Sequence, residues 1–343
     1  MGMRPIVAVV TRETRLEGLK ARWATASAAA FRLQQAVDHE VELRRRRMKR
    51  SNDDEDFSAF SLMEAEAGAD ALTSERDYEA EDEIYRLTVQ RLLSELQGDY
   101  PVKRIDRTFL PNFDFGRCLA VVVVGPDGLV ANTAKYVGDL PIVGVNPDPQ
   151  RNDGVLLPFK VEQARRAVGR ALKQQAKYRE VTLAEVNTND GQRMLAFNDF
   201  FVGASSHVSA RYTIETGEQR ESQSSSGVLI STGAGSTGWL SSLFNMAQGF
   251  ARFAGGSEPH SLTMPWDAKR LVWAVREPFR SKHSSAEMVA GFLEAEDELV
   301  LGSQMPSQGT IFSDGVESDF LEFNSGTIAR FTVSKQRARL VVT

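Results

Sequence analysis

The chain contains very little cysteine and histidine, and this excludes several kinds of site. Its 343 residues include one cysteine, Cys118, and four histidines. A single cysteine cannot form an intramolecular disulfide or a cysteine-based zinc site. No two histidines are spaced as H-x-x-x-H, so a built-in transition-metal site is not expected. Cys118 opens an apolar run and is predicted to be a small buried hydrophobic residue.

Long apolar segments and a strong excess of positive charge are also missing. The longest apolar run, residues 118–124, is far too short to span a bilayer. No secretory leader is recognisable, so the predicted location is cytoplasmic. The net charge of −5 argues against a general nucleic-acid-binding protein, because phosphate contacts dominate that affinity. We therefore expect neither a membrane nor a nucleic acid as a partner.

The length predicts two domains, and the sequence pattern changes between them. The first part alternates strand-like and helical patterns: β-branched apolar runs lie at 5–10, 119–124 and 142–145, and helical patterns at 14–48, 84–96 and 160–178. This alternation predicts an α/β domain with a Rossmann-like parallel sheet over residues 1–178. Residues 51–80 have little apolar periodicity and are expected to form a mobile insertion.

From residue 179 to 343 the pattern is different. Short strand-like runs are separated by Asn, Asp and Gly, which predicts a predominantly β domain. Gly233–Gly238 in this part fits the G-x-G-x-x-G pattern of dinucleotide-binding loops, which is a weak signal by itself. A dehydrogenase fingerprint should follow the first strand of a βαβ unit, and this one lies in the β-rich half. A Rossmann dehydrogenase is therefore not expected.

Several polar, glycine-containing stretches carry residues suited to phosphoryl transfer. The turn Gly125-Pro126-Asp127-Gly128 ends a buried strand, and glycines let backbone N–H groups approach phosphate oxygens closely. The carboxylate of Asp127 can align a ribose hydroxyl, accept its proton or hold Mg²⁺. Asn198 and Asp199 place an amide beside a carboxylate, which suits an adenine edge and ribose hydroxyls.

In this order and at this spacing, the stretches resemble the NAD kinase family, within the fold group shared with diacylglycerol and sphingosine kinases. The family has a G-G-D-G turn, an Asn-Glu pair and a loop with T-G-S-T. This chain has Gly125–Gly128, Asn198-Asp199 and Gly235-Ser236-Thr237. The mitochondrial-type branch is the most similar, through residues 145–151, 225–227, 275–278, Asp314-Gly315 and 323–326. The resemblance covers about residues 118–343.

The resemblance implies that the 2′-hydroxyl of the adenosine ribose of NAD is phosphorylated to give NADP. ATP or another phosphoryl donor is expected, with Mg²⁺ or another divalent cation carried by the nucleotide near Asp127, the expected catalytic residue. Phosphate or nucleotide contacts are expected from Gly125, Gly128, Asn146 and Arg151. NAD contacts are expected from Asn198, Asp199, Ser226, Gly235, Ser236, Thr237, Gly238 and Trp239. The family commonly forms dimers or tetramers, so a homodimer or homotetramer is expected.

Departures from the family pattern leave alternatives open. Pro126 replaces the second glycine of the turn and has no N–H to donate. Leu129 removes the hydroxyl of the usual threonine, and Asp199 is one methylene shorter than the usual glutamate. One alternative is therefore a nucleotide-binding homologue with weak or no kinase activity. Another is a kinase of the same fold acting on a lipid or sugar hydroxyl, although the Asn198-Asp199 pair favours a nucleotide over a lipid.

Overall fold

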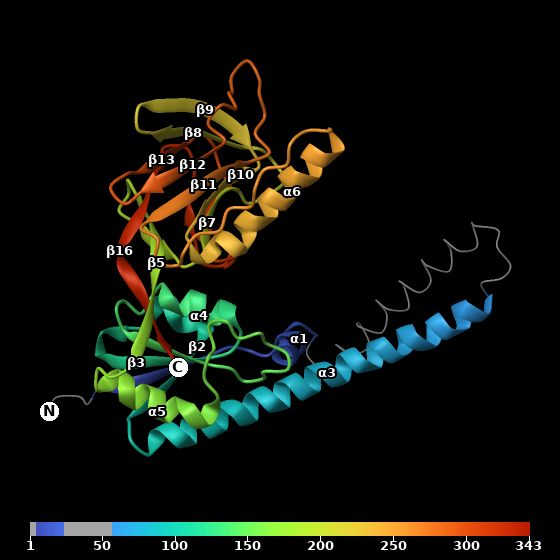
Figure 1. Cartoon of the computed structure of the whole chain (residues 1–343), viewed down its shortest axis with the longest axis vertical. Coiled ribbons are helices and arrows are strands. Elements are labelled where there is room, and N and C mark those ends of the chain that lie inside the picture. The colour runs from blue at the N-terminus through green and yellow to red at the C-terminus, as the bar shows by residue number, and fades with distance from the viewer. Residues whose placement is uncertain (1–4, 24–56) are drawn as a thin grey trace.

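The computed structural model describes residues 5–23 and 57–343, which form two regions stacked along the long axis of the molecule (Figure 1). In the N-terminal region four strands pair in parallel in the order β2-β1-β3-β4. Their bounds are β1 (Ile6–Thr11), β2 (Val102–Asp106), β3 (Cys118–Val124) and β4 (Pro141–Val145). The helices are α1 (Arg15–Trp23), α3 (Phe57–Gln97), α4 (Asp127–Ala134), α5 (Val161–Leu172) and the short 3₁₀ helices η2 (Arg107–Asn112) and η3 (Phe115–Arg117). The predicted Rossmann-like sheet is confirmed.

The central strand β3 is buried on both faces, as its continuous apolar run predicts. Val121 and Val123 pack in one cluster with residues of α4. Ala120, Val122 and Val124 pack in another cluster with residues of α3 and α5. Cys118 is a buried free thiol, as predicted. Covering both faces with helices leaves the ends of the strands as the accessible part of the sheet.

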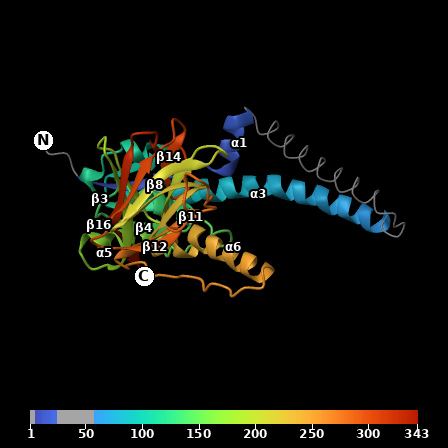
Figure 2. The ribbon, with the colours of Figure 1, turned by 90° about the horizontal axis from the view of Figure 1, so that it is seen from above.

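Helix α3 is longer than the sequence pattern indicates. Residues 57–80, which fall in the segment expected to be a mobile insertion (51–80), are the first half of this helix. Residues 51–56, and the predicted helix at 14–48 beyond Trp23, lie outside the described residues. The first half of α3 extends away from the body of the protein (Figures 1 and 2).

The C-terminal region is predominantly β, as predicted. One sheet has the order β12-β11-β10-β7-β14-β15, and β8, β9 and β13 join the other through β16. The two sheets enclose a core of buried side chains that includes Phe200, Tyr212 and Phe331. The bounds are β6 (Arg193–Ala196), β7 (Asp199–Ala204), β8 (Ala210–Thr216), β9 (Gln219–Ser225), β10 (Gly227–Ser231), η4 (Ala234–Thr237), α6 (Trp239–Phe253), β11 (Arg270–Arg276), β12 (Ala290–Glu294), β13 (Leu299–Ser303), β14 (Gly309–Ser313) and β15 (Phe320–Glu322).

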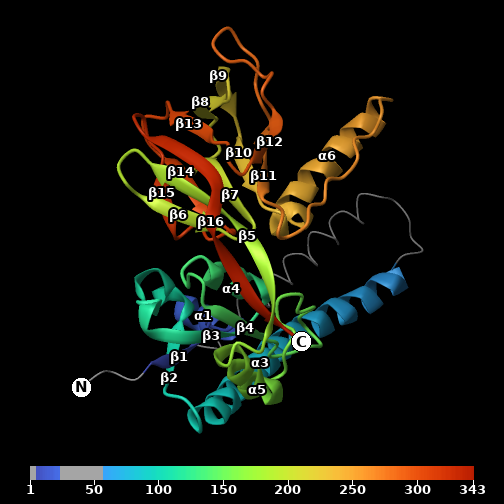
Figure 3. The ribbon, with the colours of Figure 1, turned by 60° about the vertical axis from the view of Figure 1, so that its left-hand side comes forward.

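Two long strands run from one region to the other (Figure 3). They are β5 (Lys177–Thr188) and β16 (Ile328–Val342), which pair antiparallel with each other. The strand β16 has 15 residues and shows a register shift after Val333 in its pairing with β5. The end of β16 then pairs in parallel with β4, so the last residues extend the N-terminal sheet. Among the described helices, none is long and apolar enough to cross a membrane.

Candidate functional site

The turn after β3 leads directly into α4, whose first residue is Asp127. Pro126 is the N-cap, with φ −73° and ψ 165°, angles that a proline ring adopts without strain. The Pro126 carbonyl accepts a hydrogen bond from the Leu129 N–H at 2.9 Å. The N–H groups of Asp127 and Gly128 therefore remain at the N-terminus of the helix, where an anion is favoured.

The carboxylate of Asp127 is oriented by the loop that follows β4. One of its oxygens accepts a hydrogen bond from the Leu156 N–H at 2.6 Å. No described residue donates a hydrogen bond to the other oxygen. Gly125 is buried, and a Cβ there would lie 2.8 Å from the Leu129 Cδ2 atom, so a larger residue would require the Leu129 side chain to move. The turn thus presents one partly fixed carboxylate with an oxygen left for a ligand.

The loop after β4 is held by its own polar side chains. The Asn146 amide donates to the Asn152 carbonyl at 3.1 Å, and its oxygen accepts from the Asp148 N–H at 3.1 Å. Arg151 forms ion pairs with Asp148 at 2.7 Å and, at shorter range, with Asp77 of α3. The structure therefore places Asn146 and Arg151 in the framework of the loop, with Arg151 also facing the neighbouring cleft.

An arginine-lined cleft lies at the carboxyl ends of the parallel strands. Its volume is about 560 Å³. Its lining includes Pro126, the arginines Arg12, Arg15, Arg107 and Arg151, and the acidic residues Glu13, Glu81, Asp106 and Asp148, of which Glu81 pairs with Arg12 and Asp148 with Arg151. Arg12 and Arg107 directly follow β1 and β2. Such an edge is where open α/β sheets bind ligands. The sequence analysis missed Arg12, Arg15 and Arg107. The position of Arg12 just after the predicted strand at 5–10 was a usable signal, whereas the strand before Arg107 was not predicted.

The Asn198-Asp199 pair and the glycine loop, far apart in sequence, lie against each other. Asp199 begins β7, and Asn198 stands just before it. The Asn198 carbonyl accepts a hydrogen bond from the Thr232 N–H at 2.8 Å. A Cβ at Gly235 would lie 2.1 Å from that carbonyl oxygen. The close approach requires glycine at 235, so this glycine shapes the site rather than only contacting a ligand.

The two side chains of the pair have no partners of their own. No hydrogen bond from any described residue reaches the Asn198 amide or the Asp199 carboxyl group. Asp199 is only 6% exposed. Burial, together with the nearby charge of Asp314, raises the pKa of Asp199 to about 7. A buried carboxyl group without a partner is expensive, and a bound ligand would satisfy it.

Asp314 holds the backbone of this pair in place. Its two oxygens accept from the N–H groups of Phe197 at 3.1 Å, Asn198 at 2.6 Å and Asp199 at 3.4 Å. Asp314 has a φ of +54°, which is strained for a residue other than glycine. The sequence analysis noted Asp314-Gly315 as part of the resemblance but did not place Asp314 in the site.

The remaining residues of the glycine loop divide into buried and exposed positions. The Ser236 hydroxyl donates to the Gly233 carbonyl at 2.7 Å and accepts from the Met264 N–H at 3.1 Å. Ser236 is therefore engaged within the protein. Thr237 and Gly238 are exposed just before α6.

The predicted motifs meet around one buried cluster. It contains Leu129 of α4, Phe197 next to Asn198, and Ala234 of the glycine loop. Three stretches from both halves of the chain thus come together where the two regions face each other.

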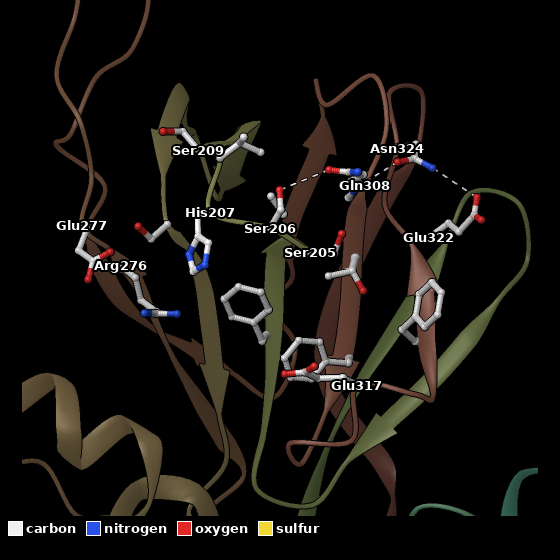
Figure 4. Close-up of a pocket in the computed structure, with 18 of the residues that line it drawn as sticks. Ser205, Ser206, His207, Ser209, Arg276, Glu277, Gln308, Glu317, Glu322 and Asn324 are labelled. Carbon is white, nitrogen blue, oxygen red and sulfur yellow. Dashed lines mark hydrogen bonds between the residues drawn. The ribbon is translucent and has the colours of Figure 1, made fainter. Parts of the chain in front are cut away.

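A second cleft, of about 810 Å³, opens in the C-terminal region (Figure 4). The Trp239 ring stacks on Phe201 with centroids 5.5 Å apart, and the Arg276 guanidinium lies 5.3 Å from the Trp239 ring centre. Ser226 also lines this cleft, whereas Asn198 and Asp199 do not. No carboxylate of a described residue forms an ion pair with Arg276. The cleft offers an aromatic platform beside a cation, which suits a planar base.

Comparison with known proteins points to one family. No family model matches the chain. An NAD kinase of Cytophaga hutchinsonii is 28% identical over 169 residues, which span 46% of this chain and 57% of that protein. The crystal structure of yeast NADH kinase complexed with NADH superposes with a TM-score of 0.51 at 16% identity, covering 76% of this chain and 80% of the other. The resemblance to the NAD kinase family is confirmed. The chain matches less than two thirds of the length of the bacterial relative.

The departures from the NAD kinase pattern are compatible with the geometry of the turn. Pro126 occupies an N-cap position whose angles proline tolerates, and Leu129 packs in the core beneath the turn. Among the described residues, no group of three or more His, Cys, Asp or Glu side chains is arranged to hold a metal ion.

Proposed function

We propose that this protein is an NAD kinase, which transfers a phosphoryl group from ATP or another donor to the 2′-hydroxyl of the adenosine ribose of NAD. The support for this comes from three features together. These are the Asp127 carboxylate at the N-terminus of α4, the arginine-lined cleft that includes the neighbouring Pro126, and the Asn198-Asp199 pair, whose side chains make no hydrogen bond with a described residue and whose neighbour Phe197 belongs to the same buried cluster as Leu129 of α4.

Phosphoryl transfer depends mainly on positioning and charge stabilisation. In the proposed reaction the 2′-oxygen bonds to the γ-phosphorus, the bond from that phosphorus to the donor's β,γ-bridging oxygen breaks, and the 2′-hydroxyl proton passes to the free oxygen of Asp127. The N-terminus of α4 and the arginines of the cleft favour the negative charge of the phosphates. We assign the binding of the donor's phosphates to Arg12, Arg107 and Arg151.

A divalent cation that binds together with the nucleotide is compatible with the residues of this site. Mg²⁺ keeps several waters and binds through one or two carboxylates plus substrate phosphates. Because the free oxygen of Asp127 is assigned to the proton of the 2′-hydroxyl, the cation would be held near Asp127 mainly by the donor phosphates and its own waters, and no further acidic ligands are required. When bound, the cation would neutralise charge on the donor phosphates.

The NAD contacts we propose begin at the Asn198-Asp199 pair. With a pKa of about 7, Asp199 is able to donate or accept a hydrogen bond near neutral pH. Trp239 and Ser226 extend the proposed contacts into the second cleft, where the stacked Trp239 and Phe201 rings suit a base. Gly235, Thr237 and Gly238 bring the chain close to the same ligand.

The assembly and the location follow the resemblance. We propose a homodimer or homotetramer, in keeping with the exposed apolar side chains of α6, where Phe250 is 66% and Phe253 is 91% exposed. The proposed location is the cytoplasm. The mitochondrial-type branch remains the proposed subgroup.

A panel of acceptors tests this function against its alternatives. The purified protein is incubated with ATP and Mg²⁺ and with NAD, NADH, a diacylglycerol or a sugar, and the phosphorylated product is identified by mass spectrometry. NADP or NADPH alone is the expected product. Phosphorylation of the lipid or sugar instead would assign a different acceptor.

The weakly active homologue is tested separately through Pro126, the residue that motivates it. NAD binding without NADP formation by the parent, together with activity gained in Pro126→Gly, would indicate a nucleotide-binding relative. The N-cap geometry of Pro126 favours the opposite result, in which the parent is active and Pro126→Gly changes its rate little.

A further inference from the structure

Lys135 is a buried lysine at the end of the helix that begins with Asp127. It is the C-cap of α4, which has eight residues and is therefore roughly 12 Å long. Its side chain is only 2% exposed. A buried ammonium group is retained in a protein only where other groups compensate its charge.

Among the described residues, the hydrogen-bond and ion-pair partners of the Lys135 ammonium group come from the C-terminal region, whereas the Tyr136 ring beside it, 5.5 Å from Nζ, belongs to the N-terminal region. Its Nζ atom donates a hydrogen bond to the Ser313 Oγ atom at 2.8 Å. It lies 3.9 Å from a carboxylate oxygen of Asp314 and 3.9 Å from one of Asp319. The Asp319 carboxylate also accepts a hydrogen bond from the Tyr136 hydroxyl. Lys135 thus links the helix of the N-terminal region to the turn after β14.

Asp314 is the same residue that holds Phe197, Asn198 and Asp199 by their N–H groups. Its carboxylate is 1% exposed. The Asp314 N–H also donates to the Asp199 carbonyl at 3.0 Å, which ties the two backbones together. A chain of direct contacts therefore runs from α4 through Lys135 and Asp314 to the Asn198-Asp199 pair.

We propose that Lys135 is a positioning residue, which acts through Asp314 to fix the Asn198-Asp199 pair relative to Asp127 at the other end of α4. This inference rests on the proposed function. An apolar residue would fill the same space and would often stabilise the fold as well as a buried ion pair. The charge is therefore better explained by the geometry it imposes across the two regions.

This inference predicts that variants of Lys135 change the affinity for NAD. Binding of NAD is measured by calorimetry without a donor, and the KM values for NAD and ATP and the kcat are measured separately. Lys135→Met is expected to weaken NAD binding roughly 10- to 100-fold, because small displacements of a positioned group have effects of that size. The KM for ATP is expected to change less than the affinity for NAD, because Lys135 does not line the arginine-lined cleft and reaches it only through the charge of Arg107.

A double variant separates positioning from general damage. If Lys135 acts through Asp314, Lys135→Met combined with Asp314→Asn should bind NAD no more weakly than Asp314→Asn alone. Effects that multiply in the double variant would overturn the inference. Lys173→Met is the matched control, since Lys173 is an exposed lysine at the C-cap of α5, and parental behaviour is expected.

A milder change covers the case in which Lys135→Met does not fold, as judged by thermal unfolding. Ser313→Ala removes only the hydrogen bond to Nζ and should weaken NAD binding roughly 3- to 10-fold. Parental NAD affinity in a folded Lys135→Met, or in Ser313→Ala if the former is unfolded, overturns the inference. If the parent itself does not bind NAD, the proposed function fails instead, so the two failures are distinguishable.

Discussion

Replacing Asp199 by asparagine should stabilise the protein above neutral pH while weakening its binding of NAD. The carboxyl group is buried beside Asp314, and no described residue donates a hydrogen bond to it. Asparagine has nearly the same shape and carries no charge. The substitution therefore removes a buried charge and leaves the packing almost unchanged.

The magnitude follows from the raised pKa. In the unfolded chain an aspartate has a pKa of about 3.9, whereas Asp199 in the folded protein has a pKa of about 7. Between these values the folded state binds more protons than the unfolded state, so the parent loses stability as the pH rises through this window. A difference of about 3 pKa units corresponds to about 4 kcal/mol, fully lost above pH 7.

The assay is urea denaturation of the parent and Asp199→Asn between pH 4 and pH 8, followed by tryptophan fluorescence. We expect Asp199→Asn to be more stable by up to about 4 kcal/mol at pH 8, with an advantage that shrinks towards pH 4. Asp139→Asn, an exposed control in the same protein, should remain within about 0.5 kcal/mol of the parent at every pH.

Two results would refute this reasoning. If the advantage of Asp199→Asn is the same at pH 5 and pH 8, the Asp199 carboxyl group is not an uncompensated buried acid. If saturating NAD raises the stability of Asp199→Asn as much as that of the parent, Asp199 is not part of the NAD site.

Three further substitutions test other parts of the site. Gly235→Ala should lower the free energy of unfolding by about 3 kcal/mol, because its Cβ would overlap the Asn198 carbonyl oxygen. Gly249→Ala, which has open space around it, serves as the control. Equal stability of the two variants in urea would contradict the close approach. Arg107→Ala should raise the KM for ATP roughly 10-fold and leave the KM for NAD unchanged, since it lines only the arginine-lined cleft; the reverse pattern in steady-state kinetics would assign the cleft to NAD. Trp239→Ala should weaken NAD binding by about 1–3 kcal/mol, whereas Trp239→Phe should keep most of the NAD affinity because stacking tolerates another ring. Parental affinity of Trp239→Ala in calorimetry would exclude base stacking at this position.

Short sequence patterns were sufficient to predict single strands and the turns that follow them. The run Leu119–Val124 and the Gly125–Gly128 turn specify a buried strand followed by a tight turn, and both are present. The family resemblance depended on short motifs of this kind. The sequence analysis placed Asp127 in a turn and did not predict that it is the first residue of α4.

Long-range contacts could not be derived from the sequence. Nothing near Asp314 indicates that its carboxylate accepts hydrogen bonds from Phe197, Asn198 and Asp199, which lie far away along the chain. The same applies to Lys135, whose charge in an apolar helix has a reason only once Asp314 is seen beside it.

Helix α6 was missed for a different reason. Leu240, Leu243 and Phe244 have helical spacing, but the surrounding strands suggested a β context. Most of the helix lies on the surface of the C-terminal region (Figure 3).

The central claim is that Asp127 activates the 2′-hydroxyl of NAD, and it is tested most directly by comparing the parent with Asp127→Asn. Both proteins are incubated with NAD, ATP and Mg²⁺, and NADP is measured with an NADP-specific dehydrogenase. We predict NADP formation by the parent and a loss of at least about 100-fold in kcat for Asp127→Asn, with NAD affinity nearly unchanged. Equal rates of NADP formation by the two proteins would contradict the account.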